Sequence, residues 1–299
     1  LCYNTDMEQV TILARAKLNL TLEVTGRAGG YHTLDSLVAA LDLSDTVTVR
    51  GRTDGKIGIT MRGMGSELLP PETNNAVRAA KAYFAAFPEC PRGLRGADIS
   101  VEKRIPVGGG LGGSSADAAG VLLALGALCG TEKEALFPLA VSLGSDAAAQ
   151  LSAGCQRMRG RGEELTPVPG MPKLYFVLLC PGEGVSSAAC FSAFDAAGGR
   201  SACPGTTERA VAHFRAGELK AAAEACKNDL TAAACALNRE VKEALDAARS
   251  LSPLTAGMTG SGSTVFALFG EREARDRALE RIGQGKFTAL AAETISNEE

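Results

Sequence analysis

The sequence predicts an α+β protein of two lobes, and 299 residues are enough to bury two cores. Residues 99–128 read as a strand, a glycine-rich loop and an apolar helix in direct succession. Proline and glycine gather at 167–172, so we expect one lobe over 10–166 and another over 167–299. Beyond that boundary the segments follow in the order β-α-α-β-α, which predicts a sheet with helices on one face.

The strand at 99–105 alternates, with Ile99, Val101 and Lys103 on one side, as expected for a strand with one packed face. The loop after it contains five glycines: Gly108, Gly109, Gly110, Gly112 and Gly113. Glycine permits positive φ and close approach of a ligand, so successive N–H groups can converge on an anion. A helix beginning near Ser114 adds unpaired N–H groups and the positive end of its dipole. Together these features predict a phosphate site.

Two other phosphate-binding patterns fit less well. A Walker A loop requires a lysine after its second glycine, and none follows Gly113. Gly108, Gly110 and Gly113 satisfy the dinucleotide pattern G-x-G-x-x-G. The strand before them alternates and carries charges, however, whereas a Rossmann first strand is a continuous apolar run.

Composition excludes several classes of protein. Net charge is −3 and no apolar run approaches about twenty residues, so we expect neither nucleic acid nor membrane as a partner. Nine cysteines without a C-x-x-C pair indicate buried thiols in a reducing cytoplasm, not a disulfide framework or a zinc site. Only two histidines are present, which disfavours a histidine-rich metal site.

The other elements follow from periodicity and from turn residues. We expect strands at 10–15, 18–24, 37–43, 46–49, 174–179 and 264–269, and helices at 73–87, 132–143, 207–226, 238–251 and 271–282. A polar turn at Ser44-Asp45 separates two of these strands. Arginines alternating from Arg157 to Arg161 indicate a solvated edge strand.

Two charged residues have either a structural or a chemical interpretation at this stage. Lys17 is a lone cation among apolar neighbours, with Asn19 on the same strand face; it either snorkels from an edge strand or serves a site. Asp146 follows Gly144 and precedes alanines, which suits a helix N-cap as well as a catalytic carboxylate.

Three separated motifs resemble one family. PVGGGLGGSSADAAG at 106–120 resembles the phosphate-binding motif of the GHMP kinases, the small-molecule kinases of galactose, homoserine, mevalonate and related substrates. AKLNLTLEV at 16–24 resembles their first motif, and MTGSGSTVFALF at 258–269 resembles their third. The resemblance implies the two-lobed GHMP kinase fold, with an N-terminal ATP-binding lobe of the ribosomal protein S5 domain 2 type and a C-terminal α+β lobe.

The resemblance also implies cofactors and a set of binding residues. The cofactors are ATP and Mg²⁺, with the ion bridging the ATP phosphates. The implied ATP-binding residues are Pro106, Val107, Gly108, Gly109, Gly110, Leu111, Gly112, Gly113, Ser114, Ser115 and Ala116. Ser114 stands where the family usually has a third loop glycine, which would make the phosphate cradle tighter.

Further segments, led by GRAGGYHTLDSLVAALDLSDTV, resemble the GHMP kinases that phosphorylate 4-diphosphocytidyl-2-C-methyl-D-erythritol on its 2-hydroxyl, in the non-mevalonate route to isoprenoids. That likeness implies that Tyr31 stacks on the cytosine and His32 hydrogen-bonds it. An aromatic face and a neighbouring donor or acceptor suit a base. The remaining implied substrate-binding residues are Asn19, Phe191, Gly260, Ser261 and Gly262.

By the same resemblance, Lys17 is the catalytic lysine and Asp146 the catalytic aspartate. The carboxylate would accept the hydroxyl proton, while the ammonium would offset charge on the transferred group. Ala147-Ala148 replaces the usual Val-Pro after Asp146, and Arg15 replaces a common proline; neither change removes a reacting group. We expect a cytoplasmic enzyme, a monomer or weak homodimer, acting on a small molecule with a cytidine diphosphate group. The alternatives are a mevalonate- or homoserine-type kinase and a non-catalytic nucleotide-binding protein.

Overall fold

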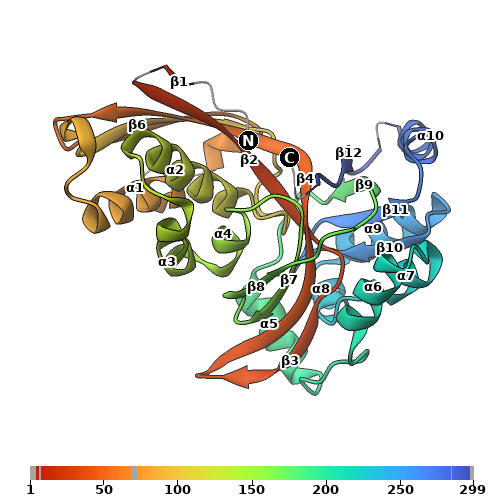
Figure 1. Cartoon of the computed structure of the whole chain (residues 1–299). Coiled ribbons are helices and arrows are strands. Elements are labelled where there is room, and N and C mark those ends of the chain that lie inside the picture. Colours follow the sequence, from red (N-terminus) through yellow and green to blue (C-terminus); the bar gives the residue numbers. More distant parts are fainter. Residues whose placement is uncertain (1–4, 7, 69, 71–72, 284, 297–299) are drawn as a thin grey trace. The chain divides into compact units, whose positions relative to one another are not determined.

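The computed structural model describes residues 5, 6, 8–68, 70, 73–283 and 285–296 (Figure 1). The chain divides into two compact units, each built from segments that are separate in the sequence. The first unit is Leu1–Ala16, Leu43–Val107 and Gly112–Ser152, and the second unit is Lys17–Asp42, Gly108–Leu111 and Ala153–Glu299. These units are discontinuous, unlike the consecutive lobes expected at 10–166 and 167–299, and that division stays a prediction.

Strands of the larger sheet contribute to both units. They are β1 Thr5–Asp6, β2 Gln9–Asn19, β3 Glu23–Ala28, β4 Tyr31–Arg52, β5 Ile57–Gly63, β6 Gly96–Lys103, β7 Cys155–Gly160 and β8 Glu164–Pro167. In the first unit, the last part of β4 pairs antiparallel with β6, and β6 pairs parallel with β5. In the second unit, the first part of β4 pairs antiparallel with β3 and β7, and β7 with β8.

Two expectations about these strands are wrong. The polar pair Ser44-Asp45 makes no turn, because β4 continues through it as one strand. Asp45 is polar but fully buried, and its carboxylate accepts the backbone N–H groups of Arg104 and Ile105. The arginine-bearing strand β7 is not an edge either, since it lies between β4 and β8, and Arg157 pairs with Asp35 on β4.

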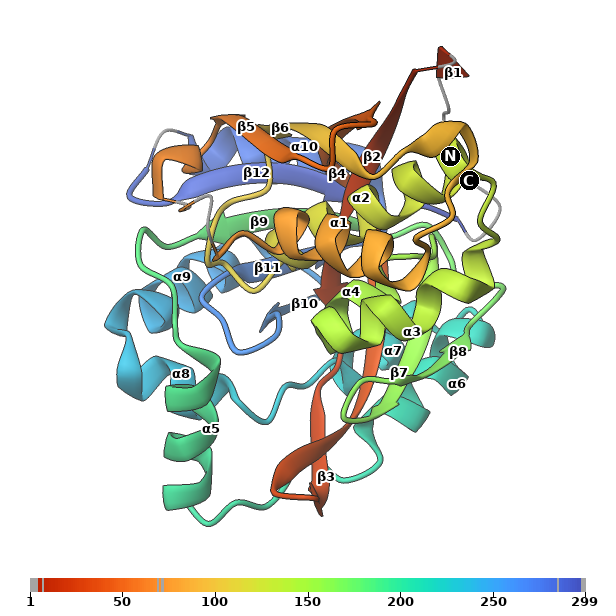
Figure 2. The ribbon, with the colours of Figure 1, turned by 90° about the vertical axis from the view of Figure 1, so that its left-hand side faces the viewer.

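The helices of the first unit confirm the sequence periodicity. They are α1 Asn75–Ala86, α2 Gly113–Cys129, α3 Lys133–Leu143 and α4 Ser145–Ala149. Figures 1 and 2 show α1, α2 and α3 on one side of the β5–β6 edge. Helix α2 is buried along almost its whole length. Gly120 allows this, because a Cβ there would lie 3.1 Å from Val47 Cγ2 and 3.3 Å from Ala14 Cβ.

A disulfide in the first unit contradicts the expectation of reduced thiols throughout. Cys90, in the segment after α1, is bonded to Cys129, the last residue of α2, with 5.5 Å between their Cα atoms. The six other cysteines in the described part of the chain form no disulfide. The two partners are 39 positions apart, so their pairing follows from the packing of α1 against α2 and not from any local spacing.

We expect the Cys90→Ser variant to have a free energy of unfolding about 2–4 kcal/mol lower than the wild type, because the bond restricts the unfolded chain. Urea unfolding of both proteins, with and without reductant, measures this. Reductant should lower the wild type to the level of the variant. Cys203→Ser, which alters a free and partly exposed thiol, is the matched control and should change little. An unchanged midpoint in Cys90→Ser would contradict the prediction.

The second unit contains a four-stranded antiparallel sheet in the order β10-β11-β9-β12. Its strands are β9 Tyr175–Cys180, β10 Thr255–Met258, β11 Val265–Phe269 and β12 Thr288–Glu293. Its helices are α5 Ser187–Ala196, α6 Thr206–Arg215, α7 Leu219–Ala225, α8 Thr231–Leu237, α9 Arg239–Ser250 and α10 Arg272–Ile282. The expected helix at 207–226 is interrupted at Gly217, where φ is +74°. Helices α5 and α8 and strands β10 and β12 were not anticipated.

The predicted arrangement of a sheet with helices on one face is present in the second unit (Figure 2). Val177 and Leu179 of β9 share one hydrophobic cluster with Val241 of α9 and Ala278 of α10. Because alternate strand residues point to the same face, both helices cover the same side of the sheet. None of the helices in the described part of the chain has the length and apolar character that a membrane crossing requires.

Candidate active site

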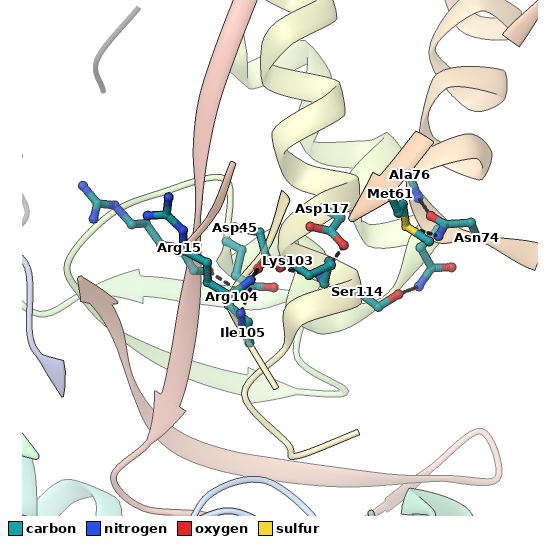
Figure 3. Close-up of polar contacts among 12 residues, drawn as sticks. Arg15, Asp45, Met61, Asn74, Ala76, Lys103, Arg104, Ile105, Ser114 and Asp117 are labelled. Atoms are coloured by element: carbon teal, nitrogen blue, oxygen red, sulfur yellow. Dashed lines mark hydrogen bonds and ion pairs between the residues drawn. The ribbon is translucent and has the colours of Figure 1, made fainter. Parts of the chain in front are cut away.

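The second half of the glycine-rich loop lies in the first unit and opens α2. Gly112 takes a left-handed conformation with φ +73°, and α2 begins at Gly113. Its N-cap residue, Gly112, has no side chain to cap the helix, and the Ser114 hydroxyl accepts a hydrogen bond from Asn75 Nδ2 at 2.9 Å (Figure 3). The first N–H groups of a helix have no partner within it, so the start of α2 presents donors suited to an anion.

The first half of the loop is fastened within the second unit. The carbonyl of Leu111 accepts the N–H of Lys17 at 3.0 Å, and that of Gly109 accepts the N–H of Thr264 at 3.0 Å. Gly110 has φ +77°, and a Cβ there would lie 2.7 Å from the Thr259 carbonyl oxygen. Only glycine fits such a position. The structure thus brings parts of all three sequence motifs together in one unit.

Lys17 lies where the three motifs meet, which we call the Lys17 junction, and it is only 5% exposed. Its Nζ donates to Asn19 Oδ1 at 2.6 Å. The Asn19 amide Nδ2 donates to Ser36 Oγ at 2.8 Å, and its backbone N–H donates to Thr259 Oγ1 at 2.9 Å. Asn19 is buried with both side-chain groups bonded, so in this structure it orients Lys17.

The turn at Gly260-Ser261-Gly262 lies beside the Lys17 ammonium. A Cβ at Gly260 would be 3.4 Å from Lys17 Nζ. Asn228 holds the turn, since its Nδ2 donates to the carbonyls of Met258 and Gly260, each at 2.8 Å. The sequence did not predict this role of Asn228, because its partners are backbone atoms 30 and 32 positions away.

Asp146 lies in the first unit, in the first turn of the short helix α4. Gly144, not Asp146, is the residue before the helix, so the N-cap interpretation of Asp146 is wrong. Ala147 and Ala148 are buried, and Gln150 Nε2 donates to the carbonyl of Arg15 at 2.9 Å. The alanines that replace Val-Pro therefore still form an anchored turn carrying the carboxylate.

Tyr31 and His32 begin β4, at the end of the β3–β4 hairpin in the second unit. Tyr31 is 59% exposed, and the Arg161 guanidinium carbon lies 4.0 Å from its ring centroid. The His32 ring stacks on Phe191 of α5, with centroids 4.5 Å apart and planes 21° from parallel. An exposed tyrosine ring and a histidine ring therefore lie at adjacent positions of the hairpin.

A buried charge cluster in the first unit was not predicted. Lys103, only 3% exposed, lies between Asp45 on β4 and Asp117 on α2 and pairs with both, at 2.6 Å from Asp117 Oδ2 (Figure 3). Asp45 also binds the N–H groups of the two residues after Lys103. The cluster therefore links β4, the end of β6 and the first turns of α2, at both ends of the glycine-rich loop.

The signal for this cluster was present in the alternation of β6, where Lys103 shares the packed face with Ile99 and Val101. A lysine is almost never fully buried unless it is paired. Such a position therefore requires a carboxylate partner, although the sequence does not say which one.

The cluster has two carboxylates for one ammonium, and Asp117 Oδ1 is buried without a hydrogen-bond partner in the described structure. Burial raises the pKa of Asp117 from 3.8 to about 7, with Asp45 adding to the rise and Lys103 opposing it. Between about pH 4 and 7, Asp117 is therefore protonated in the folded protein, whereas it has lost its proton in the unfolded chain. Stability contributed by this proton is present at low pH and is lost as pH rises through 7.

We expect Asp117→Asn to remove this loss. As pH rises from 5.5 to 8, the free energy of unfolding of the variant minus that of the wild type should increase by on the order of 1–2 kcal/mol. Urea unfolding of both proteins across this pH range measures the difference. Asp98→Asn, on the exposed side of β6 where the carboxylate pairs with Arg52, is the matched aspartate-to-asparagine substitution. If the free energy of unfolding depends on pH in the same way for the wild type and Asp117→Asn, the raised pKa of Asp117 is refuted.

Comparison with known proteins agrees with these motifs. Residues 74–155 match the GHMP kinases N terminal domain and residues 208–287 the GHMP kinases C terminal region. A 4-diphosphocytidyl-2-C-methyl-D-erythritol kinase of Cutibacterium acnes is 39% identical over 85% of this chain and 84% of its own length. The enzyme of that name from Paracoccus denitrificans is 40% identical over 90% of each chain.

Solved structures show the same fold. A crystal structure of 4-(cytidine 5'-diphospho)-2C-methyl-D-erythritol kinase is 32% identical, with a TM-score of 0.73 over 96% of this chain and 100% of that chain. A homoserine kinase from Cytophaga hutchinsonii, at 19% identity and TM-score 0.76 over 100% and 98%, shares the fold. The expected two-domain GHMP kinase fold is confirmed. The chain belongs to the 4-diphosphocytidyl-2-C-methyl-D-erythritol kinase family of the ATP-dependent GHMP kinases.

Proposed function

We propose that this chain transfers the γ-phosphoryl group of ATP to the 2-hydroxyl of 4-diphosphocytidyl-2-C-methyl-D-erythritol, giving the 2-phosphate and ADP. A new P–O bond forms to the substrate oxygen, the bond from the γ-phosphorus to the bridging oxygen breaks, and the hydroxyl proton is released. This is a step of the non-mevalonate route to isoprenoid precursors. Relatives named for this activity, at 39% and 40% identity over most of the chain, support the assignment.

One observation carries the choice of substrate. The second unit contains both the Lys17 junction and the β3–β4 hairpin, on which exposed Tyr31 adjoins the stacked pair of His32 and Phe191. A pyrimidine needs a flat aromatic surface and a hydrogen-bonding group for its edge. The acceptors of mevalonate and homoserine kinases carry no base, so recognition of those acceptors does not need such a hairpin.

ATP is assigned to the loop at residues 106–116. The first N–H groups of α2, left uncapped by any side chain, would bind phosphate oxygens. Gly109 and Gly110 are held against the turn at 259–264, so this part of the loop is already fastened without ATP. A preformed set of donors needs little reorganisation when the ligand binds.

Lys17 and Asp146 are assigned to the reaction itself. Asp146 would accept or orient the hydroxyl proton, and the Lys17 ammonium would offset negative charge on the transferred group. Asn19 would keep the ammonium in place, since their side chains are 2.6 Å apart. The turn at Gly260, Ser261 and Gly262, beside the same ammonium, would contact the substrate.

Mg²⁺ would accompany ATP and neutralise its phosphate charge. In the described residues, no group of three or more histidine, cysteine, aspartate or glutamate side chains is arranged to hold a metal. Mg²⁺ that binds together with substrate phosphates usually keeps several waters and takes only one or two protein carboxylates. We therefore assign no side chain as a dedicated ligand.

We also place the enzyme in the cytoplasm, where ATP is supplied, as a monomer or weak homodimer.

The test is an ADP-release assay with Mg-ATP and three acceptors: 4-diphosphocytidyl-2-C-methyl-D-erythritol, mevalonate and homoserine. We expect turnover with the cytidyl compound alone. Tyr31→Ala should raise KM for this acceptor without changing KM for ATP, because the tyrosine is assigned to the cytosine and not to ATP. Phe137→Ala, which truncates an exposed aromatic side chain on α3 in the first unit, serves as the matched substitution.

Two outcomes would contradict the proposal. Turnover with mevalonate or homoserine would retain a GHMP kinase and remove the base-binding role of Tyr31 and His32. ATP binding without turnover on any acceptor would indicate a nucleotide-binding protein that does not catalyse transfer.

A further inference from the structure

The His32 ring is fixed in place by residues of one helix. Phe191 of α5 stacks on it, and Phe194, one turn further along α5, meets it edge-on at 6.4 Å and 74°. The side chain of His32 retains 14% exposure. The ring is thus packed over one face while part of its edge stays open, which suits a group that contacts a ligand through one atom.

Asp195, at the end of the same helix, binds one of the two ring nitrogens. His32 Nε2 and Asp195 Oδ1 are 2.9 Å apart. Arg27 on β3 pairs with the other oxygen of Asp195. His32, followed by Arg27, holds the pKa of Asp195 below its usual value, so this carboxylate is ionised at neutral pH. An ionised carboxylate only accepts hydrogen bonds, so Nε2 must carry the proton.

This pairing decides the chemistry of the other nitrogen. A neutral imidazole has one N–H donor and one acceptor nitrogen, so a proton on Nε2 makes Nδ1 the acceptor. Asp195 is the only hydrogen-bonding partner of the ring in the described residues. Nδ1 is therefore the ring nitrogen that can bind a ligand, and it can only accept a hydrogen bond from that ligand.

We propose that Asp195 is a positioning residue that sets the tautomer of His32 and thereby makes the site select cytosine over uracil. Cytosine carries an amino donor at C4, whereas uracil carries a carbonyl acceptor there, as thymine does. An acceptor Nδ1 pairs with the first and opposes the second. The inference rests on the proposed function, which supplies the cytidine ligand, and adds to it the residue that enforces the choice of base.

The tautomer can be measured directly because the chain has only two histidines, His32 and His213. His213 is a built-in comparison, because it contacts the Glu218 carboxylate through Nδ1, at 2.6 Å, and not through Nε2. We expect two-bond ¹H–¹⁵N correlation spectra at pH 8 to show the proton on Nε2 of His32 and on Nδ1 of His213, with His213→Gln for assignment. A proton on Nδ1 of His32 would overturn the proposal.

Base selectivity is measured by titration of the whole protein with CDP and with UDP, which needs no turnover. We expect CDP to bind at least 10²-fold more tightly, as buried hydrogen-bonding sites discriminate strongly. Asp195→Ala should reduce this ratio at least tenfold, and Asp195→Glu should restore part of it. Glu218→Gln, which removes the partner of His213, should leave the ratio unchanged. Thermal unfolding of each variant confirms that it is folded.

The outcomes separate this inference from the proposed function. Turnover with the cytidyl acceptor, together with equal binding of CDP and UDP, would overturn the role of Asp195 and keep the kinase assignment. The same holds if Asp195→Ala keeps the wild-type ratio. Absence of both turnover and CDP binding would overturn the proposed function, and this inference with it.

Discussion

Replacing Asp146 by asparagine is expected to lower kcat for phosphoryl transfer by about 10²–10⁴-fold, the usual contribution of a positioned acid or base. Asparagine keeps the size of the side chain and one oxygen acceptor but cannot take a proton. Helix α4 should persist, because the buried residues that hold it, Ala147 and Ala148, are untouched. ADP release under saturating Mg-ATP and acceptor gives kcat, and nucleotide affinity is measured separately by titration.

The control for Asp146→Asn is Glu134→Gln, which neutralises an exposed acid in the first turn of α3. It should leave kcat unchanged. Nucleotide affinity should stay within about twofold in both variants, because the loop that is assigned to ATP is intact. A kcat for Asp146→Asn close to that of the wild type would show that the hydroxyl proton leaves by another route, since the transition state of this transfer demands little base strength.

Lys103→Met should lower the free energy of unfolding by about 3–5 kcal/mol, the typical effect of breaking a buried ion pair from one side. Methionine fills the space of the lysine stem but leaves Asp45 and Asp117 buried without their cation. A domain has only about 5–15 kcal/mol of stability in total, so this is a large fraction. Urea unfolding at pH 7 gives the value.

A second substitution tests the cause of this loss. Lys103→Met combined with Asp117→Asn removes one of the two stranded carboxylates, so we expect part of the stability to return. Lys81→Met, at an exposed position of α1, is the matched control. If Lys103→Met and Lys81→Met unfold at the same urea concentration, the buried cluster does not stabilise the first unit.

Most secondary structure of this chain could be predicted because local pattern and tertiary environment agree. The alternation at 99–105 and the long apolar run after Ser114 became β6 and α2. The failure at Ser44-Asp45 shows the limit of such patterns. A polar pair in a sequence looks the same whether it faces water in a turn or meets a buried lysine, and Lys103 is 58 positions away.

The disulfide was missed for a related reason. Composition and the absence of C-x-x-C pairs describe cysteines along the chain, while Cys90 and Cys129 meet only after α1 and α2 have packed. The candidate site residues that belong to sequence motifs were easier to predict than the residues that hold them in place. Lys17, Tyr31 and Asp146 follow from motifs, whereas Asn228 and Asp195 act through partners that no spacing reveals.

The discontinuous make-up of the two units bears on how this protein can be divided. The chain passes between them after residues 16, 42, 107, 111 and 152. A gene fragment ending at residue 166 would encode the whole first unit but would separate Lys17 and Tyr31 from the four-stranded sheet of their own unit. Such a split therefore cuts through the second unit, and its two pieces would have to associate again before that unit is complete.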